Sequence, residues 1–383
     1  MIRKKLLDYV GEMEKKSRAF KNFKRGINSK ATLCDYTDYL KRFMKFHDIE
    51  DQYDEVVMFD TKKIDNLISD YLDSLIERKL KGISQRAHLM GIERLFIMND
   101  CIWHKDRIRK SITKDDEISG GNVPITNNEI HMLLQCTKSL RTKAFVHFLA
   151  TTGSRPAGIT DPILCIKHLV EMNYKNKKCY GLKIYDGSKS GYWSFFTPES
   201  TSILDKWIEF RKNNGEIISD ESPLFITIKK TNTKNQNLTE DNARYIIYDL
   251  IRVSGMNRKK ISNNRYDKAV MYMFRKRFNT ILKLNNDVNS NIAEKLMAHK
   301  RGLDGTYLQP TREECFREFV KAIPQLTIDP TERQKIEIEL KQQKIDELEA
   351  KTQEVLETTK TNKDLESRIK NLERMYLESK NAL

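Results

Sequence analysis

The C-terminal segment most constrains the fold, because it contains neither glycine nor proline from residue 331 onward. It is rich in glutamate, lysine, glutamine and leucine, which are strong helix formers. Apolar residues recur at heptad spacing in two seams, with a register slip of three residues near 358–361. The seams are Ile338, Ile345, Leu348 and Val355, and then Leu365, Ile369, Leu372 and Tyr376. This pattern predicts a long helix over 329–383 that self-associates as a coiled coil; a single exposed helix on the domain surface is the alternative.

Charge is distributed unevenly along the 383 residues, which carry a net charge of +15. Residues 329–383 hold 11 basic and 13 acidic side chains, so residues 1–328 carry +17. The first thirty residues alone contain ten lysines and arginines against three acids. Such a basic excess favours a polyanionic partner. We interpret residues 1–28 as a basic arm that would bind nucleic acid through Lys15, Lys16, Arg18, Lys21, Lys24 and Arg25; a merely solvated basic surface is the alternative.

Residues 29–110 show three helical repeats of apolar side chains, over 29–47, over 61–79 and from Ser84 onward. Ser29 is placed to cap the first of these helices. The repeats predict a small helical bundle over 29–110. Residues 111–124 are polar, include a Gly-Gly pair and end in proline, which is typical of an interdomain linker.

Residues 125–328 have the pattern of a second, mixed domain. Thr126 and Glu129 fit a capping box, and the apolar run 141–152, which contains His147 as a core histidine, ends at Gly153. Over 179–198 two β-rich runs flank DGSKSG and predict a hairpin, and helical patterns return over about 240–322. The expected fold is therefore mainly α with a small β-hairpin or sheet: a helical N-terminal domain, an α+β domain over 125–328 and a long C-terminal helix.

Several function classes find no support in the sequence. The six cysteines form no C-x-x-C pair, the histidines lack zinc-ligand spacing, and there is no Walker motif, so we expect neither a metal nor a cofactor. The N-terminus does not read as a secretory signal, and no run approaches the ~18 apolar residues of a membrane span. We expect a reduced, soluble, cytoplasmic protein associated with the nucleoid and without a membrane partner.

Four short stretches of sequence, or islands, contain charged and aromatic side chains that stand out from their surroundings. In TTGSRPAGI, Arg155 sits on a turn between two helices, where it could fork onto a phosphate or form a plain surface salt bridge. Lys189 at the hairpin tip could protonate a leaving oxygen or be merely solvated. Tyr272 and Arg275 share one helical face in YMFRKRFNTIL. The fourth island, MAHKRGLDGTYLQP over 297–310, contains His299 and Tyr307.

The order of these residues resembles the catalytic pattern of the tyrosine recombinase family, which includes the phage-type integrases. That pattern is an arginine in a T-G-x-R turn, a hairpin lysine, H-x-x-R, G-H and a final tyrosine. Matching positions are Thr152-Gly153-Ser154-Arg155, Lys189, Tyr272-x-x-Arg275, Ala298-His299 and Tyr307. The resemblance covers about 125–310, and 15–110 looks like the core-binding domain of the family. The last of these stretches, over 297–310, is most similar to the corresponding sequence of archaeal integrases.

The sequence departs from the family pattern at three positions. Tyr272 stands where the family usually has histidine, which keeps a hydrogen-bonding group but not a general base. Ala298 replaces a glycine, which is a small change. Gly158 stands three residues after the first arginine, where the family often has an acidic residue that orients this arginine.

The resemblance implies a site-specific DNA recombinase that forms a covalent 3′-phosphotyrosyl intermediate without metal or ATP. Its catalytic residues would be Tyr307 as nucleophile, Arg155 and Arg275 on the phosphate, Lys189 as general acid, and His299 and Tyr272 as hydrogen-bonding groups. Lys177, Lys178 and Lys183 are alternatives to Lys189, and Lys276 and Arg277 would face solvent or the DNA backbone. Implied partners are double-stranded DNA with specific attachment sites, further copies up to a tetramer, and an accessory protein on the tail. A type IB topoisomerase-like strand transferase and a non-catalytic DNA-binding relative are the alternatives.

Overall fold

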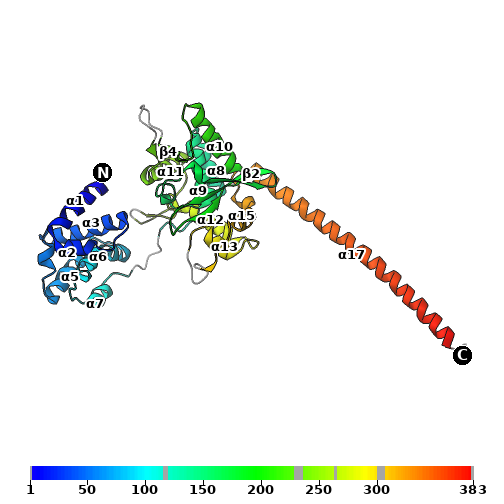
Figure 1. Ribbon diagram of the computed structural model, residues 1–383, viewed down its shortest axis with the longest axis horizontal. Coiled ribbons are helices and arrows are strands. Elements are labelled where there is room, and N and C mark those ends of the chain that lie inside the picture. The colour runs from blue at the N-terminus through cyan, green and yellow to red at the C-terminus, as the bar shows by residue number, and fades with distance from the viewer. Residues whose placement is uncertain (1, 115–119, 228–235, 263–264, 300–306, 381–383) are drawn as a thin grey trace. The chain divides into compact units, whose positions relative to one another are not determined.

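The computed structural model describes residues 2–114, 120–227, 236–262, 265–299 and 307–380. The chain forms two compact units, Met1–Ile118 and Ser119–Leu383 (Figure 1). The boundary between them falls inside the segment 111–124, which the sequence analysis interprets as a linker.

The first unit is helical throughout its described part. Its helices are α1 (Ile2–Lys16), α2 (Arg18–Lys24), α3 (Lys30–Phe46), α4 (Tyr53–Val56), α5 (Thr61–Glu77), α6 (Gly82–Ile97) and α7 (Lys105–Lys110). Ser29 caps α3 by accepting a hydrogen bond from the backbone N–H of Thr32, as predicted. Helix α6 begins two residues before Ser84. The three predicted helices are therefore confirmed, with small shifts at their ends.

Residues 1–28 differ from the predicted basic arm. Helices α1 and α2 belong to the core of the first unit, where Val10, Met13, Phe20 and Phe23 are buried. These apolar side chains lie at helical spacing between the charged ones, so each helix has one buried and one solvated face. The charge count alone hides this periodicity. The segment is a structural part of the bundle that also presents basic side chains.

The second unit combines helices with three small antiparallel sheets. Its helices are α8 (Asn127–Gln135), α9 (Leu140–Thr152), η1 (Pro156–Ile159), η2 (Ile166–His168), α10 (Pro198–Asn213), α11 (Glu240–Ser254), α12 (Tyr272–Leu284), α13 (Ser290–Lys295), α15 (Arg312–Val320), α16 (Ile323–Leu326) and α17 (Pro330–Lys380). Its strands are β1 (Leu169–Tyr174), β2 (Lys177–Ile184), β3 (Tyr192–Phe195), β4 (Ile226–Thr227), β5 (Gln236–Asn237), β6 (Lys260–Ser262) and β7 (Arg265–Tyr266). The largest sheet has the order β1-β2-β3, and β4-β5 and β6-β7 form pairs. The expected mainly α fold with a small sheet is confirmed.

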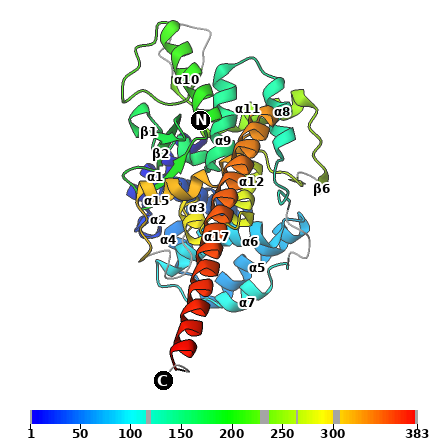
Figure 2. The same cartoon turned by 90° about the vertical axis from the view of Figure 1, so that its right-hand side faces the viewer.

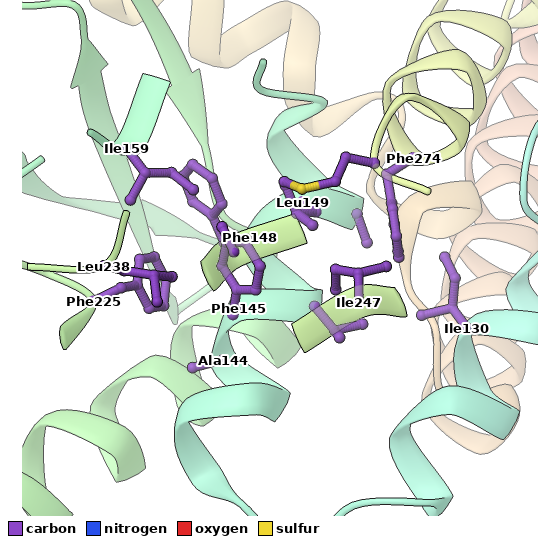
Figure 3. Close-up of a cluster of buried hydrophobic side chains, with 14 of the residues drawn as sticks. Ile130, Ala144, Phe145, Phe148, Leu149, Ile159, Phe225, Leu238, Ile247 and Phe274 are labelled. Atoms are coloured by element: carbon purple, nitrogen blue, oxygen red, sulfur yellow. The ribbon is translucent and has the colours of Figure 1, made fainter. Parts of the chain in front are cut away.

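Helix α9 is the centre of the second unit. Phe145, Phe148 and Leu149 are fully buried and pack against Phe225 and Phe274 from other elements (Figure 3). Each such side chain contributes about 1.5–3 kcal/mol by burial. The helix is buried on nearly every side, so its position relative to α12 is fixed by close packing.

Two predictions for this part of the second unit are confirmed: the capping box at the start of α8 and the core histidine in α9. Thr126 and Glu129 form the predicted capping box at the start of α8. His147 is buried within α9, and its Nδ1 lies 3.0 Å from the hydroxyl of Ser200. Burial lowers the pKa of His147 to about 3, so it is a neutral core histidine.

Gly153 ends α9 in a conformation that few other residues could adopt. Its φ is 55°, in the left-handed region. A Cβ atom at this position would lie 2.7 Å from the ring of Phe278. The chain therefore turns sharply here, close to α12, and this turn places Arg155 beside that helix.

Helix α17 is continuous over 51 residues, which confirms the predicted long C-terminal helix (Figure 2). Near its start Ile336 is buried and Leu340 packs against the neighbouring core cluster. Side chains from 341 to 375 are all exposed. Within the described part of the chain, none of the helices is both long and apolar enough to span a bilayer.

Candidate active site

Arg275, one of the predicted catalytic residues, is held firmly within the second unit. It lies one turn into α12, and its guanidinium donates hydrogen bonds to the carbonyl oxygens of Gly153 at 2.8 Å and Met297 at 2.5 Å. Its Nη2 lies 2.9 Å from Nε2 of His299. Burial lowers the pKa of Arg275, and the nearby charge of Arg155 lowers it further. Arg275 on α12 therefore forms hydrogen bonds with both the end of α9 and the segment after α13.

The contacts of His299 define its protonation state. A guanidinium can only donate, so Nε2 of His299 must accept from Arg275 and carry no proton. The proton then sits on Nδ1, which lies 2.6 Å from Oε2 of Glu294 and donates to it. Burial lowers the pKa of His299, although the Glu294 carboxylate opposes this effect. His299 is thus a neutral ring, oriented by a carboxylate on one side and an arginine on the other.

Glu294 is a further residue of the candidate site that was not predicted from the sequence. It lies in α13, and its carboxylate also pairs with Lys283 at 2.8 Å. In the sequence, Glu294 is visible only as a carboxylate five residues before His299. This spacing predicts no contact between the two side chains until the turn that joins them is known.

Arg155 is placed by the Gly153 turn at the entry to η1. Its guanidinium is partly exposed and forms no hydrogen bond or ion pair with the residues that the structure describes. The surface salt bridge considered above is therefore not observed there. Arg275 likewise has no carboxylate partner within the described ranges. Two neighbouring positive charges without a counter-ion are a suitable site for an anion such as a phosphate.

The space around Gly158 is too narrow for a side chain unless its neighbours shift. A Cβ atom there would lie 2.4 Å from the hydroxyl oxygen of Ser154. Across the same region Tyr192 on β3 is buried, with its hydroxyl close to the side chains of Ser154 and Arg275. Burial raises the pKa of Tyr192, while Arg275 and then Arg155 act against that rise. Tyr192 therefore lies near both arginines, and the sequence analysis missed it.

Lys189 and Tyr272 both have accessible side chains. Lys189 lies in the exposed turn between β2 and β3, where the sequence analysis predicted it. Tyr272 is the first residue of α12 and is 48% exposed. Among the alternative lysines, Lys178 pairs with Asp205 at 3.1 Å, and Lys183 lies over the ring of Trp193. Two of the three lysines considered as alternatives to Lys189 therefore have contacts within the protein.

Tyr307 stands apart from the other predicted site residues. Its side chain is 77% exposed, and its hydroxyl forms no hydrogen bond within the described part of the chain. It lines a shallow pocket with Leu308, Pro310 and Arg317. Residues 300–306 of its island lie outside the described residues. The structure therefore brings Arg155, Arg275 and His299 together but does not join Tyr307 to them.

The prediction of solvent or DNA-backbone contacts for Arg277 is wrong. Its side chain is buried, and its guanidinium donates to the carbonyl oxygens of Ala150 and Leu326 and to the side chain of Asn127. Burial lowers its pKa to about 10. This arginine faces the core side of α12, one position from a partly exposed lysine. Lys276 donates to Asn122 at 2.8 Å and remains accessible.

The basic residues of the N-terminal helices are accessible to different degrees. Lys16 pairs with Glu12 at 2.5 Å, and Lys24 pairs with Glu14 and is only partly exposed. The remaining predicted DNA-binding side chains of this segment are exposed: Lys15, Arg18, Lys21 and Arg25.

Comparison with known proteins gives structural neighbours only. No protein-family model and no curated protein matches the sequence. The XerH site-specific recombinase in a pre-cleavage complex with its difH substrate is 16% identical, covers 78% of each chain and has a TM-score of 0.46. Residues 75–356 of lambda integrase bound to DNA are 16% identical over 82% of this chain and 97% of that chain, with a TM-score of 0.48. The XerA recombinase is 16% identical over 83% and 95%, with a TM-score of 0.35.

Proposed function

We propose that the chain is a site-specific DNA recombinase that cuts and rejoins DNA through a covalent 3′-phosphotyrosyl intermediate. The observation that carries the proposal is the pair Arg155 and Arg275, which lie together without a carboxylate partner in the described ranges. A buried arginine held by three hydrogen bonds is already oriented before a phosphate arrives. Such preorganisation is what stabilises developing charge in a transition state.

The two arginines would bind the scissile phosphate of double-stranded DNA. Attack on a phosphodiester places negative charge on its non-bridging oxygens, and two converging guanidinium groups stabilise that charge. His299 keeps Arg275 in place through Nε2, and Glu294 keeps His299 in the tautomer that this contact requires. Tyr272, exposed at the start of the same helix, would donate a hydrogen bond to the phosphate.

Tyr307 would be the nucleophile. Its phenolic O–H releases its proton to solvent, its oxygen bonds to phosphorus as the bond between phosphorus and the 5′ oxygen breaks, and Lys189 donates a proton to that leaving oxygen. A free 5′ hydroxyl then reverses the step and releases the tyrosine, so the phosphodiester energy is retained and no ATP is consumed.

Covalent trapping tests this proposal. We would incubate the protein with nicked duplexes tiled from the DNA flanking its gene and analyse the products on denaturing gels. Wild type should yield a protein–DNA adduct, and Tyr307→Phe should yield none while it still binds DNA. Tyr245→Phe is the matched control, since Tyr245 is also well exposed and lies on α11.

An adduct formed by Tyr307→Phe would refute the assignment of the nucleophile. Adducts at every duplex, with relaxation of supercoils, would favour a topoisomerase-like strand transferase. The absence of any adduct with wild type on whole-genome fragments, despite tight binding, would favour a non-catalytic DNA-binding protein.

A further inference from the structure

We infer that α17 pairs with α17 of a second copy as a parallel, two-stranded coiled coil. The inference starts from the exposed seam of this helix, where Ile345, Leu348 and Val355 are 47%, 55% and 64% exposed. A stripe of large apolar side chains along an otherwise charged helix is a typical surface for a partner. The inference is independent of the DNA chemistry proposed above.

The protein's own body leaves this seam uncovered. Helix α17 attaches to the second unit through Ile336 and Leu340, and Lys175 donates to Gln343 at 2.9 Å. Positions 336, 340 and 343 share one face of the helix, because they lie three or four residues apart. Ile338 and Ile345 lie on a different face, and both are exposed. Attachment to the body and pairing with a partner can therefore occur together.

The residue types at the seam favour two parallel strands. In parallel coiled coils, β-branched isoleucine or valine at a with leucine at d favours two strands over three or four. The a positions are Ile338, Ile345, Thr352 and Thr359 and, after the register slip of three residues, Ile369 and Tyr376. The d positions with apolar residues are Leu348, Val355, Leu365 and Leu372. Lys341 and Asn362 at d positions weaken the seam but help to fix its register.

The charges beside the seam select the orientation. Basic residues occupy g positions, namely Lys344, Lys351 and Arg368, and acidic residues occupy e positions, namely Glu349, Glu366 and Glu373. In a parallel pair each g residue faces the e residue five positions later on the other helix, which brings opposite charges together. In an antiparallel pair g faces g and e faces e, so like charges would meet.

Two contacts of opposite charge are specified by this register. Lys344 would face Glu349 of the second copy, and Arg368 would face Glu373, each occurring twice by symmetry. Within its own helix Arg368 pairs with Asp364 at 3.5 Å, an exposed contact that a partner can replace. Because one helix carries both halves of each contact, the complementary partner is another copy of the chain. The net charge of −2 over 329–383 also makes DNA a poor partner for this helix.

Charge exchange in the full-length protein tests the contacts. Light scattering should give twice the chain mass of 45.1 kDa for wild type. Lys344→Glu and Glu349→Lys should each weaken dimerisation roughly ten-fold, since two attractive exposed pairs become repulsive. The double variant should restore it, and an equimolar mixture of the single variants should form heterodimers. Glu357→Lys is the matched control, because Glu357 lies on the outer face of the register and is exposed.

Cysteine crosslinking tests the orientation. We would introduce Thr352→Cys and Asn362→Cys separately in a Cys136→Ser background, because Cys136 is an exposed native thiol. A parallel, in-register pair should form an intermolecular disulfide at both positions, and the background protein at neither. A disulfide at only one position, a monomeric wild type at all concentrations, or a mass of three or more chains would overturn the inference.

Discussion

At the scale of single residues, the two arginines differ in how much the fold depends on them. Arg275 donates to two backbone carbonyl oxygens inside the protein, whereas the guanidinium of Arg155 forms no hydrogen bond within the described ranges. Arg275→Ala should therefore lower both the cleavage rate and the melting temperature. Each unsatisfied buried acceptor costs about 1–3 kcal/mol. Arg155→Ala should lower the rate by a similar factor of ~10²–10³ and leave the melting temperature unchanged.

Adduct formation rates and thermal melts of the two variants check this contrast. Equal loss of stability in both variants would mean that Arg155 is bound within the fold. An unchanged cleavage rate in either variant would remove that residue from the active site.

The pH dependence of the reaction should be set in part by His299. Folding lowers its pKa, so the neutral ring contributes stability that is fully present above about pH 6.5. This contribution is lost as the pH falls from there through the pKa of the folded state, because a protonated ring can no longer accept from Arg275. Cleavage should decline over the same range.

Glu294→Gln should shift that acid decline toward lower pH, since the carboxylate raises the pKa of His299. It should also slow cleavage roughly ten-fold at neutral pH, because the ring loses the group that orients it. A pH–rate profile and an NMR titration of His299 measure both effects. Glu313→Gln, an exposed carboxylate on α15, is the control and should change neither. A shift toward higher pH would contradict the assigned tautomer.

At the scale of secondary-structure elements, the hairpin β2-β3 presents Lys189 at its exposed turn. If Lys189 is the general acid, Lys189→Ala should reduce cleavage by ~10²–10⁴-fold. A substrate with sulfur in place of the 5′ leaving oxygen should restore most of the rate, because a thiolate leaves without protonation. Lys178→Ala should have little effect, since that lysine pairs with Asp205. Rescue by the sulfur substrate in Lys178→Ala and not in Lys189→Ala would reverse the assignment.

Elements with a long repeat were predictable, and elements that depend on distant partners were not. The capped, periodic helices α3 and α8, the apolar run of α9 and the continuous α17 follow from local sequence alone. Strands such as β4 and β6 are two or three residues long and exist only because another strand pairs with them. The residues of the candidate site divide in the same way, into those that a local motif predicts and those that depend on distant partners. Arg155 and Arg275 stand in local motifs, whereas Glu294 and Tyr192 acquire meaning only through contacts made by folding.

At the scale of the whole molecule, the basic excess resides in residues 1–328, and the C-terminal helix is slightly acidic. DNA binding should therefore weaken steeply with salt, with log K falling by ~0.9 for each phosphate neutralised per unit of log salt concentration. Part of this charge lies on the exposed faces of α1 and α2, which fold into the helical unit. These faces are consequently held in fixed positions by the core and do not move as a free arm.

Charge reversal on these faces tests their role. Arg18→Glu and Lys21→Glu should each weaken binding to any DNA sequence and reduce the salt slope by about one. Lys360→Glu, an exposed residue of α17 outside the proposed seam, removes the same charge and should leave the slope unchanged. Fluorescence anisotropy over a salt series measures all three. If all three variants lowered the slope equally, net charge alone would account for binding; if none did, the helical unit would contact DNA through another face.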